Sequence, residues 1–385
     1  MIAIARRNLS CLFFSPNSFL CNPNVLSVHF FSTASVIRSI PSPEIYHVLF
    51  HKHNLSPKSS SLAASCLPKF QGPERADSML SFLKENSFTS NQLEKIVMYK
   101  PQILGFPIER LKSIFKVFQD LGLSSEEIAK MMSSDKRILL SSKVKVNHII
   151  SSLSILKVLL GSNEEVARLL KRCSWFVRSD LEKILMPNVE ILKSCGIPME
   201  RILHFLYTQP RCFFSKPDIV RKSVDRAIKF GVPQTSIVFI QAIGVFSCMS
   251  EGLWEVKLKT LRDLGFSDDN IFTMFRKTPL VFTAPGKKVK NVIELLLATG
   301  KYNISSIATA PSALGCSIEK RLEPRLQILR LLESRNLIEK WPALSRVATL
   351  TDDGFFDRFV RPYYDKIGEE NITKICVGWQ KEMNL

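Results

Sequence analysis

The side chains best suited to chemistry in this sequence are lysines and arginines that recur near the ends of predicted helices. Their charged groups bind nucleic-acid phosphates, and equivalent positions of consecutive repeats line one face of a stacked array. We therefore predict a basic surface that follows a phosphate backbone. Its predicted members are Arg137, Arg172, Arg178, Arg211, Lys216, Arg276, Lys277, Lys287, Lys288, Lys290, Arg321 and Arg325.

Each of these cations has a second interpretation, as a solvated surface residue or as the partner of a nearby carboxylate. The series also has a gap around Gly244, where Ser247, Cys248, Ser250 and Glu251 occupy positions that hold cations in neighbouring repeats. The gap argues against one continuous basic track. Aromatic residues such as Trp175 and Phe213 recur at one phase of the repeat, which favours core packing over base stacking.

The net charge supports an anionic partner. Lys and Arg number 53 against 35 Asp and Glu, which gives a formal charge of +18 and an isoelectric point near 9.6. Such an excess is typical of proteins that bind nucleic acid or acidic lipid, although a basic protein with a solvated surface has the same composition. No apolar run outside the N-terminal segment is long enough for a membrane span, so we expect no membrane partner.

Motifs for catalysis and for metal binding are missing from the sequence. It contains no Gly-x-Ser-x-Gly, phosphate-binding loop or His-Glu-x-x-His. The nine cysteines form no Cys-x-x-Cys pair and are expected to be free, buried thiols. His47 and His51 have the spacing of two ligands on a helix, but a third ligand is lacking. We therefore predict a protein that is not an enzyme and that uses neither a metal nor a cofactor.

Two columns of residues recur in phase and predict the architecture. The first is Gly122, Gly161, Gly196, Gly231, Gly265 and Gly300; the second is Pro101, Lys136, Ser174, Pro210, Gly244, Pro279 and Pro311. Periods of this length mark units that are too small to bury their own apolar face and must stack on neighbours. The columns predict an all-α fold, a helical-repeat solenoid in which each unit contains two helices and a short extra turn.

Short sequence motifs mark where the helices of each repeat begin and end. Leu111, Ile114, Phe115 and Phe118 form an apolar stripe, and Gly122 is expected to end that helix in a left-handed conformation. Ser124 with Glu127 and Thr89 with Gln92 are capping boxes that start second helices, while Pro198 and Pro233 are expected as first-turn prolines. A proline late in the second helix should stop it, after which the chain packs back as a short turn.

These boundaries give a domain prediction. The first 43 residues contain eight Ser and three Arg but no Asp or Glu, a composition typical of organelle transit peptides. We predict a transit peptide at 1–43, a linker with a capping half-repeat at 44–73, the solenoid at 74–365 and a tail at 366–385. The repeats are predicted at about 74–109, 110–146, 147–182, 183–219, 220–253, 254–288, 289–321 and 322–365.

The repeated phrase resembles the mitochondrial transcription termination factor (mTERF) family. Its clearest copy runs from Leu264-Gly265-Phe266-Ser267 to Pro279-Leu280-Val281-Phe282. The segments from Gly72 to Leu80, from Lys320 to Arg325 and from Phe355 to Val360 are similar to the two ends of the array in the plant branch of that family. The resemblance extends over residues 44 to 375 and identifies the predicted units as about eight mTERF-type repeats of two to three helices.

The resemblance implies a left-handed superhelix that binds nucleic acid in mitochondria or chloroplasts. We expect a monomer that binds organellar double-stranded DNA in a basic groove and controls transcription termination or pausing in mitochondria, together with other organellar transcription or splicing proteins. One alternative is an organellar RNA-binding factor for intron splicing or transcript maturation. A second alternative, from another class, is a helical-repeat scaffold that binds proteins.

Overall fold

The fold is all-α. A computed structural model describes residues 41–67, 72–140 and 146–375 of the chain, and every regular element in these ranges is a helix. The predicted all-α helical-repeat solenoid is therefore confirmed. The predicted transit peptide at 1–43 lies almost wholly outside the described residues, as does the second half of the predicted tail.

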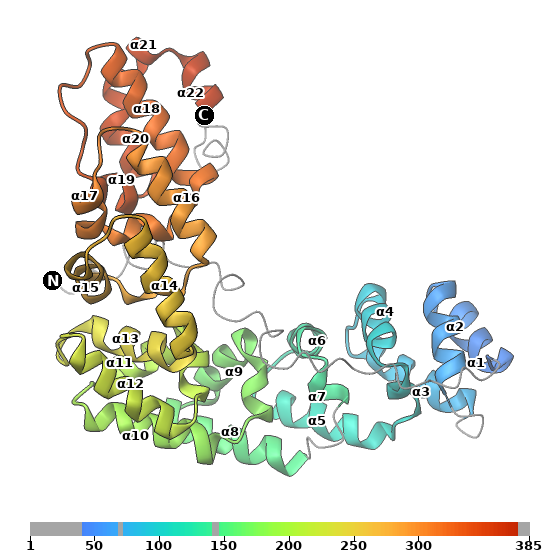
Figure 1. The fold of residues 1–385 in the computed structure, drawn as a ribbon. Helices are drawn as coiled ribbons and strands as arrows, with labels where there is room; N and C mark the ends of the chain where they lie inside the picture. Colours follow the sequence, from blue (N-terminus) through green and yellow to red (C-terminus); the bar gives the residue numbers. More distant parts are fainter. Residues whose placement is uncertain (1–40, 68–71, 141–145, 376–385) are drawn as a thin grey trace. The chain divides into compact units, whose positions relative to one another are not determined.

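The described chain divides into two compact units, whose boundary falls between Val189 and Glu190 inside α10 (Met186–Ser194). In the unit that ends at Val189, first and second helices of consecutive repeats form two rows (Figure 1). Neighbouring helices within each row are in contact: α5 with α8 in one row, and α6 with both α4 and α9 in the other. The first row is α3 (Pro73–Glu85), α5 (Ile108–Asp120) and α8 (Val146–Leu160); the second is α4 (Ser90–Tyr99), α6 (Ser125–Ser134) and α9 (Asn163–Arg172).

Each of these repeats ends in a short helix that packs back on the pair, as predicted. The short helices are η2 (Pro101–Gly105), α7 (Arg137–Leu140) and η3 (Ser174–Arg178). Ahead of the first pair, the unit contains α1 (Pro43–His47), η1 (Val48–Lys52) and α2 (Pro57–Cys66), and after the last short helix comes η4 (Leu181–Leu185). Contacts of α2 with α4 and η2 place it where it covers the first repeat.

The unit that begins at Glu190 repeats the arrangement. In Figure 1, α14, α16 and α18 form one row and α15, α17 and α19 form the other. Its helices, in chain order, are α11 (Met199–Thr208), η5 (Pro210–Phe214), α12 (Pro217–Lys229), α13 (Ile237–Cys248), α14 (Glu251–Asp263), α15 (Asp268–Lys277), η6 (Pro279–Thr283), α16 (Gly286–Leu297), α17 (Ile304–Thr309), η7 (Pro311–Gly315), η8 (Ile318–Leu322), α18 (Glu323–Ser334), α19 (Leu344–Thr349), α20 (Asp352–Phe359), η9 (Arg361–Tyr363), α21 (Tyr364–Ile367) and α22 (Glu369–Ile375).

The glycine column ends first helices in the way that the sequence predicts. Gly122 has φ +93°, and its amide donates to Gln119 O while the amide of Leu123 donates to Phe118 O. A residue without Cβ enters this left-handed region without steric cost, so the chain reverses within two residues. The other five glycines of the column also have positive φ.

Second helices begin at capping boxes and end at the proline column. Both reciprocal bonds of the capping box are present at Ser124 with Glu127 and at Thr89 with Gln92. Pro101, Pro210, Pro279 and Pro311 are each the first residue of a short 3-10 helix, which confirms the predicted stop. Two predicted first-turn prolines are wrong: Pro198 is the N-cap of α11, and α13 begins only at Ile237, with Ser236 rather than Pro233 before it.

The repeat that contains Gly244 differs from its neighbours, as its sequence indicates. Helix α13 continues through Gly244 to Cys248 without a separate 3-10 helix. A Cβ on Gly244 would lie 2.8 Å from Cys212 Sγ and 3.1 Å from Phe205 Cζ. The absence of a side chain here therefore lets α13 pack closely against the preceding repeat.

Apolar side chains fill the interior of both units. Phe118, Phe176, Phe213 and Phe355 are among the largest side chains that are almost fully buried, which confirms core packing for Phe213, whereas Trp175 is only partly buried. Within the described ranges, no single helix has both the length and the hydropathy to cross a membrane; α13 and α14 meet that test only together, across a bend of 113°.

Candidate nucleic-acid interface

In the unit that ends at Val189, one carboxylate holds two of the predicted cations. Asp135, the C-cap of α6, accepts from Arg137 Nε at 3.3 Å and from Arg178 Nε at 2.8 Å and Nη2 at 2.7 Å. Arg137 begins α7 and stays exposed, whereas Arg178 ends η3 of the next repeat and its side chain is only 17% exposed. Arg172, the last residue of α9, is exposed. Arg137 and Arg172 can therefore face a ligand, while Arg178 mainly joins two repeats.

In the unit that begins at Glu190, the first of the predicted cations lie in and next to η5. Arg211 is the second residue of η5, and Lys216 is the N-cap of α12; both are exposed. The short helix projects its polar side outward because Cys212 and Phe213 are buried on its other side. The predicted gap in the series follows at α13, where Ser250 instead caps α14 through a bond from the amide of Leu253.

Arg276 and Lys277 are the last two residues of α15, and both are exposed. Arg276 Nε donates to Phe272 O at 3.3 Å, and Lys277 Nζ donates to Thr309 O, at the end of α17, at 2.9 Å. Cations at helix C-termini satisfy carbonyls that lack an intrahelical donor. These two residues thus combine a local structural role with exposure to solvent.

Three lysines lie near the start of α16, and they differ in environment. Lys287 and Lys290 are exposed, and Lys290 is 3.7 Å from Glu294. Lys288 is partly buried and donates from Nζ to Gly315 O at 2.8 Å; burial is the main factor that lowers its pKa. Lys287 and Lys290 are therefore available to phosphate, whereas Lys288 caps η7.

Arg325 is not at the surface, which corrects the prediction for this residue. Its side chain is fully buried, and its guanidinium donates to Val347 O at 2.7 Å and to Asp352 Oδ1 at 2.5 Å and lies over the Phe355 ring. Arg321, partly buried, is 3.7 Å from the other oxygen of Asp352. The sequence predicted both arginines for the basic surface because it does not show which faces of η8, which contains Arg321, and of α18, which contains Arg325, pack inward.

A recurring bond explains why several cations are structural. A cation of the first helix donates to a carbonyl at the end of the short helix in the same repeat: Arg110 to Leu139 O, Lys257 to Ala284 O and Lys288 to Gly315 O, at 3.2, 2.6 and 2.8 Å. Burial lowers the pKa of each of the three groups. Sequence reasoning missed Arg110 and Lys257 in this role, although a cation 27 to 29 residues before the short helix ends is a usable signal.

Of the twelve predicted cations, eight are exposed. These are Arg137, Arg172, Arg211, Lys216, Arg276, Lys277, Lys287 and Lys290. They lie at the ends of second helices, in the short helices, or at or near the start of the following helix. We call these eight residues the junction cations.

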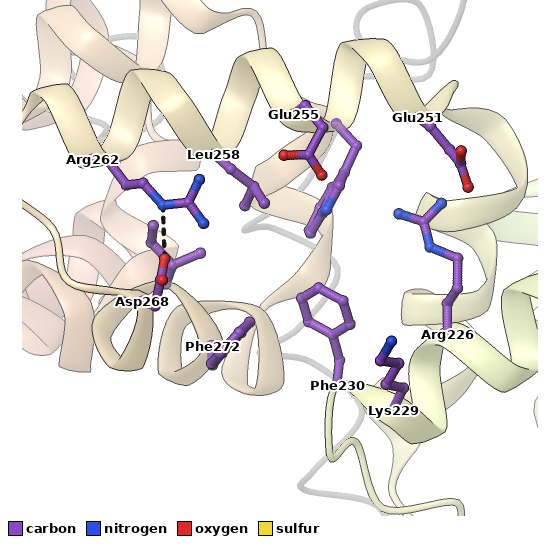
Figure 2. A pocket seen from close by; sticks show the side chains of 11 residues that line it. Arg226, Lys229, Phe230, Glu251, Glu255, Leu258, Arg262, Asp268 and Phe272 are labelled. Carbon is purple, nitrogen blue, oxygen red and sulfur yellow. Dashed lines mark hydrogen bonds and ion pairs between the residues drawn. The ribbon is translucent and has the colours of Figure 1, made fainter.

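A pocket of about 450 Å³ lies among α12, α14 and α15, and none of the predicted cations is among the residues that line it (Figure 2). In Figure 2, Arg226 and Glu251 lie at one end of it with their charged groups toward each other, and Arg262, whose Nε is 2.8 Å from Asp268 Oδ1, lies at the other end. Aromatic rings, including Phe230, form its floor. Because the walls carry both signs of charge, this pocket does not extend the basic surface.

Comparison with known proteins gives a consistent result. The profile of the family described as mTERF matches residues 38–240 and 230–356. The Arabidopsis thaliana protein named transcription termination factor MTERF15, mitochondrial, is 20% identical over 367 residues, which cover 91% of this chain and 75% of that protein. Transcription termination factor MTERF8, chloroplastic, from the same organism, is 20% identical over 233 residues, which cover 60% of this chain and 44% of that protein.

Proposed function

The chain belongs to the mTERF family, and from that membership we propose that it is a nucleic-acid-binding regulator of organellar gene expression that performs no catalysis. The relatives are named for transcription termination, one in mitochondria and one in chloroplasts. We propose double-stranded DNA of the mitochondrion as the target and control of termination or pausing as the outcome. The acid-free, Ser- and Arg-containing leader supports the organellar location.

The observation that carries this proposal is the recurrence of the junction cations. They lie where one repeat meets the next: in the unit that ends at Val189 they come from two consecutive repeats, and in the other unit they lie on either side of the repeat of Gly244, which contributes none. Exposed cations that gather at the junctions of an array can bind phosphates at several points along a nucleic-acid backbone. Contacts of this kind position the protein and bind every sequence, while specificity requires separate contacts to base edges.

The direct test is the salt dependence of binding. For duplex DNA, the slope of log affinity against log salt is about −0.9 for each neutralised phosphate, and for single strands about −0.7. The triple variant Arg276→Gln, Lys277→Gln, Lys287→Gln is expected to flatten the slope by up to about 2.7 units on duplex. The matched control is Lys222→Gln with Lys259→Gln, which removes exposed lysines from the middle of α12 and α14.

Fluorescence anisotropy with duplex DNA and with single-stranded RNA of the same sequence measures both slopes. A triple variant with the slope of the wild type, or a control variant that loses as much, contradicts the proposed surface. Preference for the RNA favours the alternative of a splicing or maturation factor.

Crosslinking of the tagged protein in isolated mitochondria, followed by sequencing of recovered DNA and RNA, identifies the target in its own compartment.

A further inference from the structure

Two thiols from consecutive repeats are in contact. Cys212 lies in η5, and Cys248 is the last residue of α13. Their sulfur atoms are 3.8 Å apart and share a weak hydrogen bond, although 36 positions separate the residues in sequence. A disulfide requires a sulfur–sulfur distance of about 2.05 Å, so the two sulfurs, already in contact, must come closer before they can bond.

The surrounding backbone holds this pair in place from two sides. Gly244, one turn before Cys248, has no side chain, and a Cβ there would lie 2.8 Å from Cys212 Sγ. On the other side, Ser215 Oγ donates to Ser247 O at 2.9 Å and ties the residue after η5 to the end of α13. The thiol contact is therefore fixed by the packing of two helices and not by the rotamers of the cysteines alone.

The two thiols differ in exposure and acidity. Cys212 is buried, whereas Cys248 is partly exposed at the helix end. Hydrogen bonding with Cys212 is the main factor that lowers the pKa of Cys248, with help from Ser247 and the charge of Arg211, although burial opposes the change. Since the thiolate is the nucleophile, Cys248 is the sulfur that reacts first and Cys212 the one that resolves.

We propose that Cys212 and Cys248 form a reversible intramolecular disulfide when the protein is exposed to hydrogen peroxide. The Cys248 thiolate attacks one peroxide oxygen, the O–O bond breaks, and the products are Cys248 sulfenic acid and hydroxide. Cys212 then attacks the sulfenic sulfur, the S–S bond forms, and water leaves. The hydroxide takes up the proton that Cys248 released, so two thiols and one peroxide give one disulfide and two water molecules.

The bond would link two repeats at the point where the array departs from its pattern. Helix α13 lacks the separate 3-10 helix of its neighbours, and Arg211, a junction cation, is adjacent to Cys212. Oxidation would therefore fix the junction between η5 and α13 next to the candidate interface. The disulfide itself does not depend on nucleic-acid binding, so its test is separate from that of the proposed function.

The test uses the full chain, reduced and then treated with hydrogen peroxide. Free thiols are alkylated, and the digested protein is analysed by mass spectrometry. We expect a linked Cys212–Cys248 peptide pair that disappears on reduction. Cys195→Ser and Cys316→Ser, which remove thiols whose pKa is raised mainly by burial, are expected to retain the link. In Cys212→Ser, we expect Cys248 to remain as a sulfenic acid that dimedone labels.

Two results would overturn the proposal. One is alkylation of Cys212 and Cys248 to the same extent with and without peroxide; the other is crosslinking of Cys248 mainly to a second chain. A further variant tests the role of the packing: Gly244→Ala is expected to lower the yield of the linked peptide severalfold. Its control is Gly252→Ala, where a Cβ meets no atom within 4 Å. Circular dichroism checks that both variants fold, and a wild-type yield in folded Gly244→Ala contradicts the inference that close packing at Gly244 holds the two thiols together.

Discussion

Arg178 donates from Nε at 2.8 Å and from Nη2 at 2.7 Å to the same carboxylate oxygen of Asp135, 43 residues earlier in the chain. Both side chains are largely buried. The pair connects the end of α6 to the end of η3 in the next repeat. An ion pair between two repeats is thus built from a residue that the sequence pattern assigns to ligand binding.

Loss of this pair is expected to affect stability more than binding. Arg178→Gln leaves the buried Asp135 carboxylate without its main partner, and we expect a loss of about 1.5–3 kcal/mol in unfolding free energy. Urea unfolding measures the loss, and hydrogen exchange localises it to α6, α7 and η3. The control is Arg172→Gln, at an exposed residue, for which a comparable loss of stability would argue against the assignment.

Arg325 allows a second test that distinguishes a role in stability from a role in nucleic-acid binding. Arg325→Met removes the bonds to Val347 O and Asp352, and we expect a destabilisation of about 1.5–3 kcal/mol with no change in the salt slope of nucleic-acid binding. Lys287→Gln, at an exposed residue in α16, should show the opposite pattern. A flattened slope in folded Arg325→Met would restore this residue to the interface.

The glycine column predicts a backbone effect that is independent of side-chain contacts. At Gly122, φ is +93° and a Cβ would meet no atom within 4 Å. Gly122→Ala is therefore expected to cost about 1–2 kcal/mol from backbone strain alone. Gly286→Ala, at the first residue of α16, is the control and should be neutral or slightly stabilising. Thermal or urea unfolding distinguishes the two, and equal effects would contradict the explanation.

A buried histidine makes the N-terminal helices sensitive to pH. His53 is 3% exposed and lies 2.8 Å from Asp77 Oδ1 through Nε2. Burial is the main factor that lowers its pKa below the ordinary value of 6.5, and the bond to Asp77 only partly opposes this. As pH falls through 6.5, the unfolded chain takes up a proton on His53 before the folded chain does. The free energy of unfolding therefore decreases on acidification below 6.5 and is unaffected by this group above it.

We expect α1 to α3 to exchange amide hydrogens more readily, relative to intrinsic rates, at about pH 5.5 than at about pH 7.5. In His53→Gln this difference should disappear, whereas in His51→Gln, at an exposed residue, it should remain. Protection that is independent of pH in the wild type would show that protonation of His53 has no such effect.

The sequence by itself determined the repeat and the residues at which its helices begin and end. Left-handed glycines such as Gly122, the capping box of Ser124 and Glu127, and the stop at Pro279 depend on backbone geometry within a few residues, so each is readable without a fold. The missing break at Gly244 was readable for the same reason. The two errors, at Pro198 and Pro233, are displacements of a helix start by a few residues.

Tertiary structure alone decided what each cation does. Lys287 and Lys288 are adjacent in sequence and equal in charge, yet one is exposed while the other reaches Gly315 O. Arg325 is predicted for the same basic surface as Arg276 but is fully buried against Asp352. Which face of a helix packs inward depends on contacts between residues 22 to 43 positions apart, and the charge of a residue and its immediate neighbours in sequence do not contain that information.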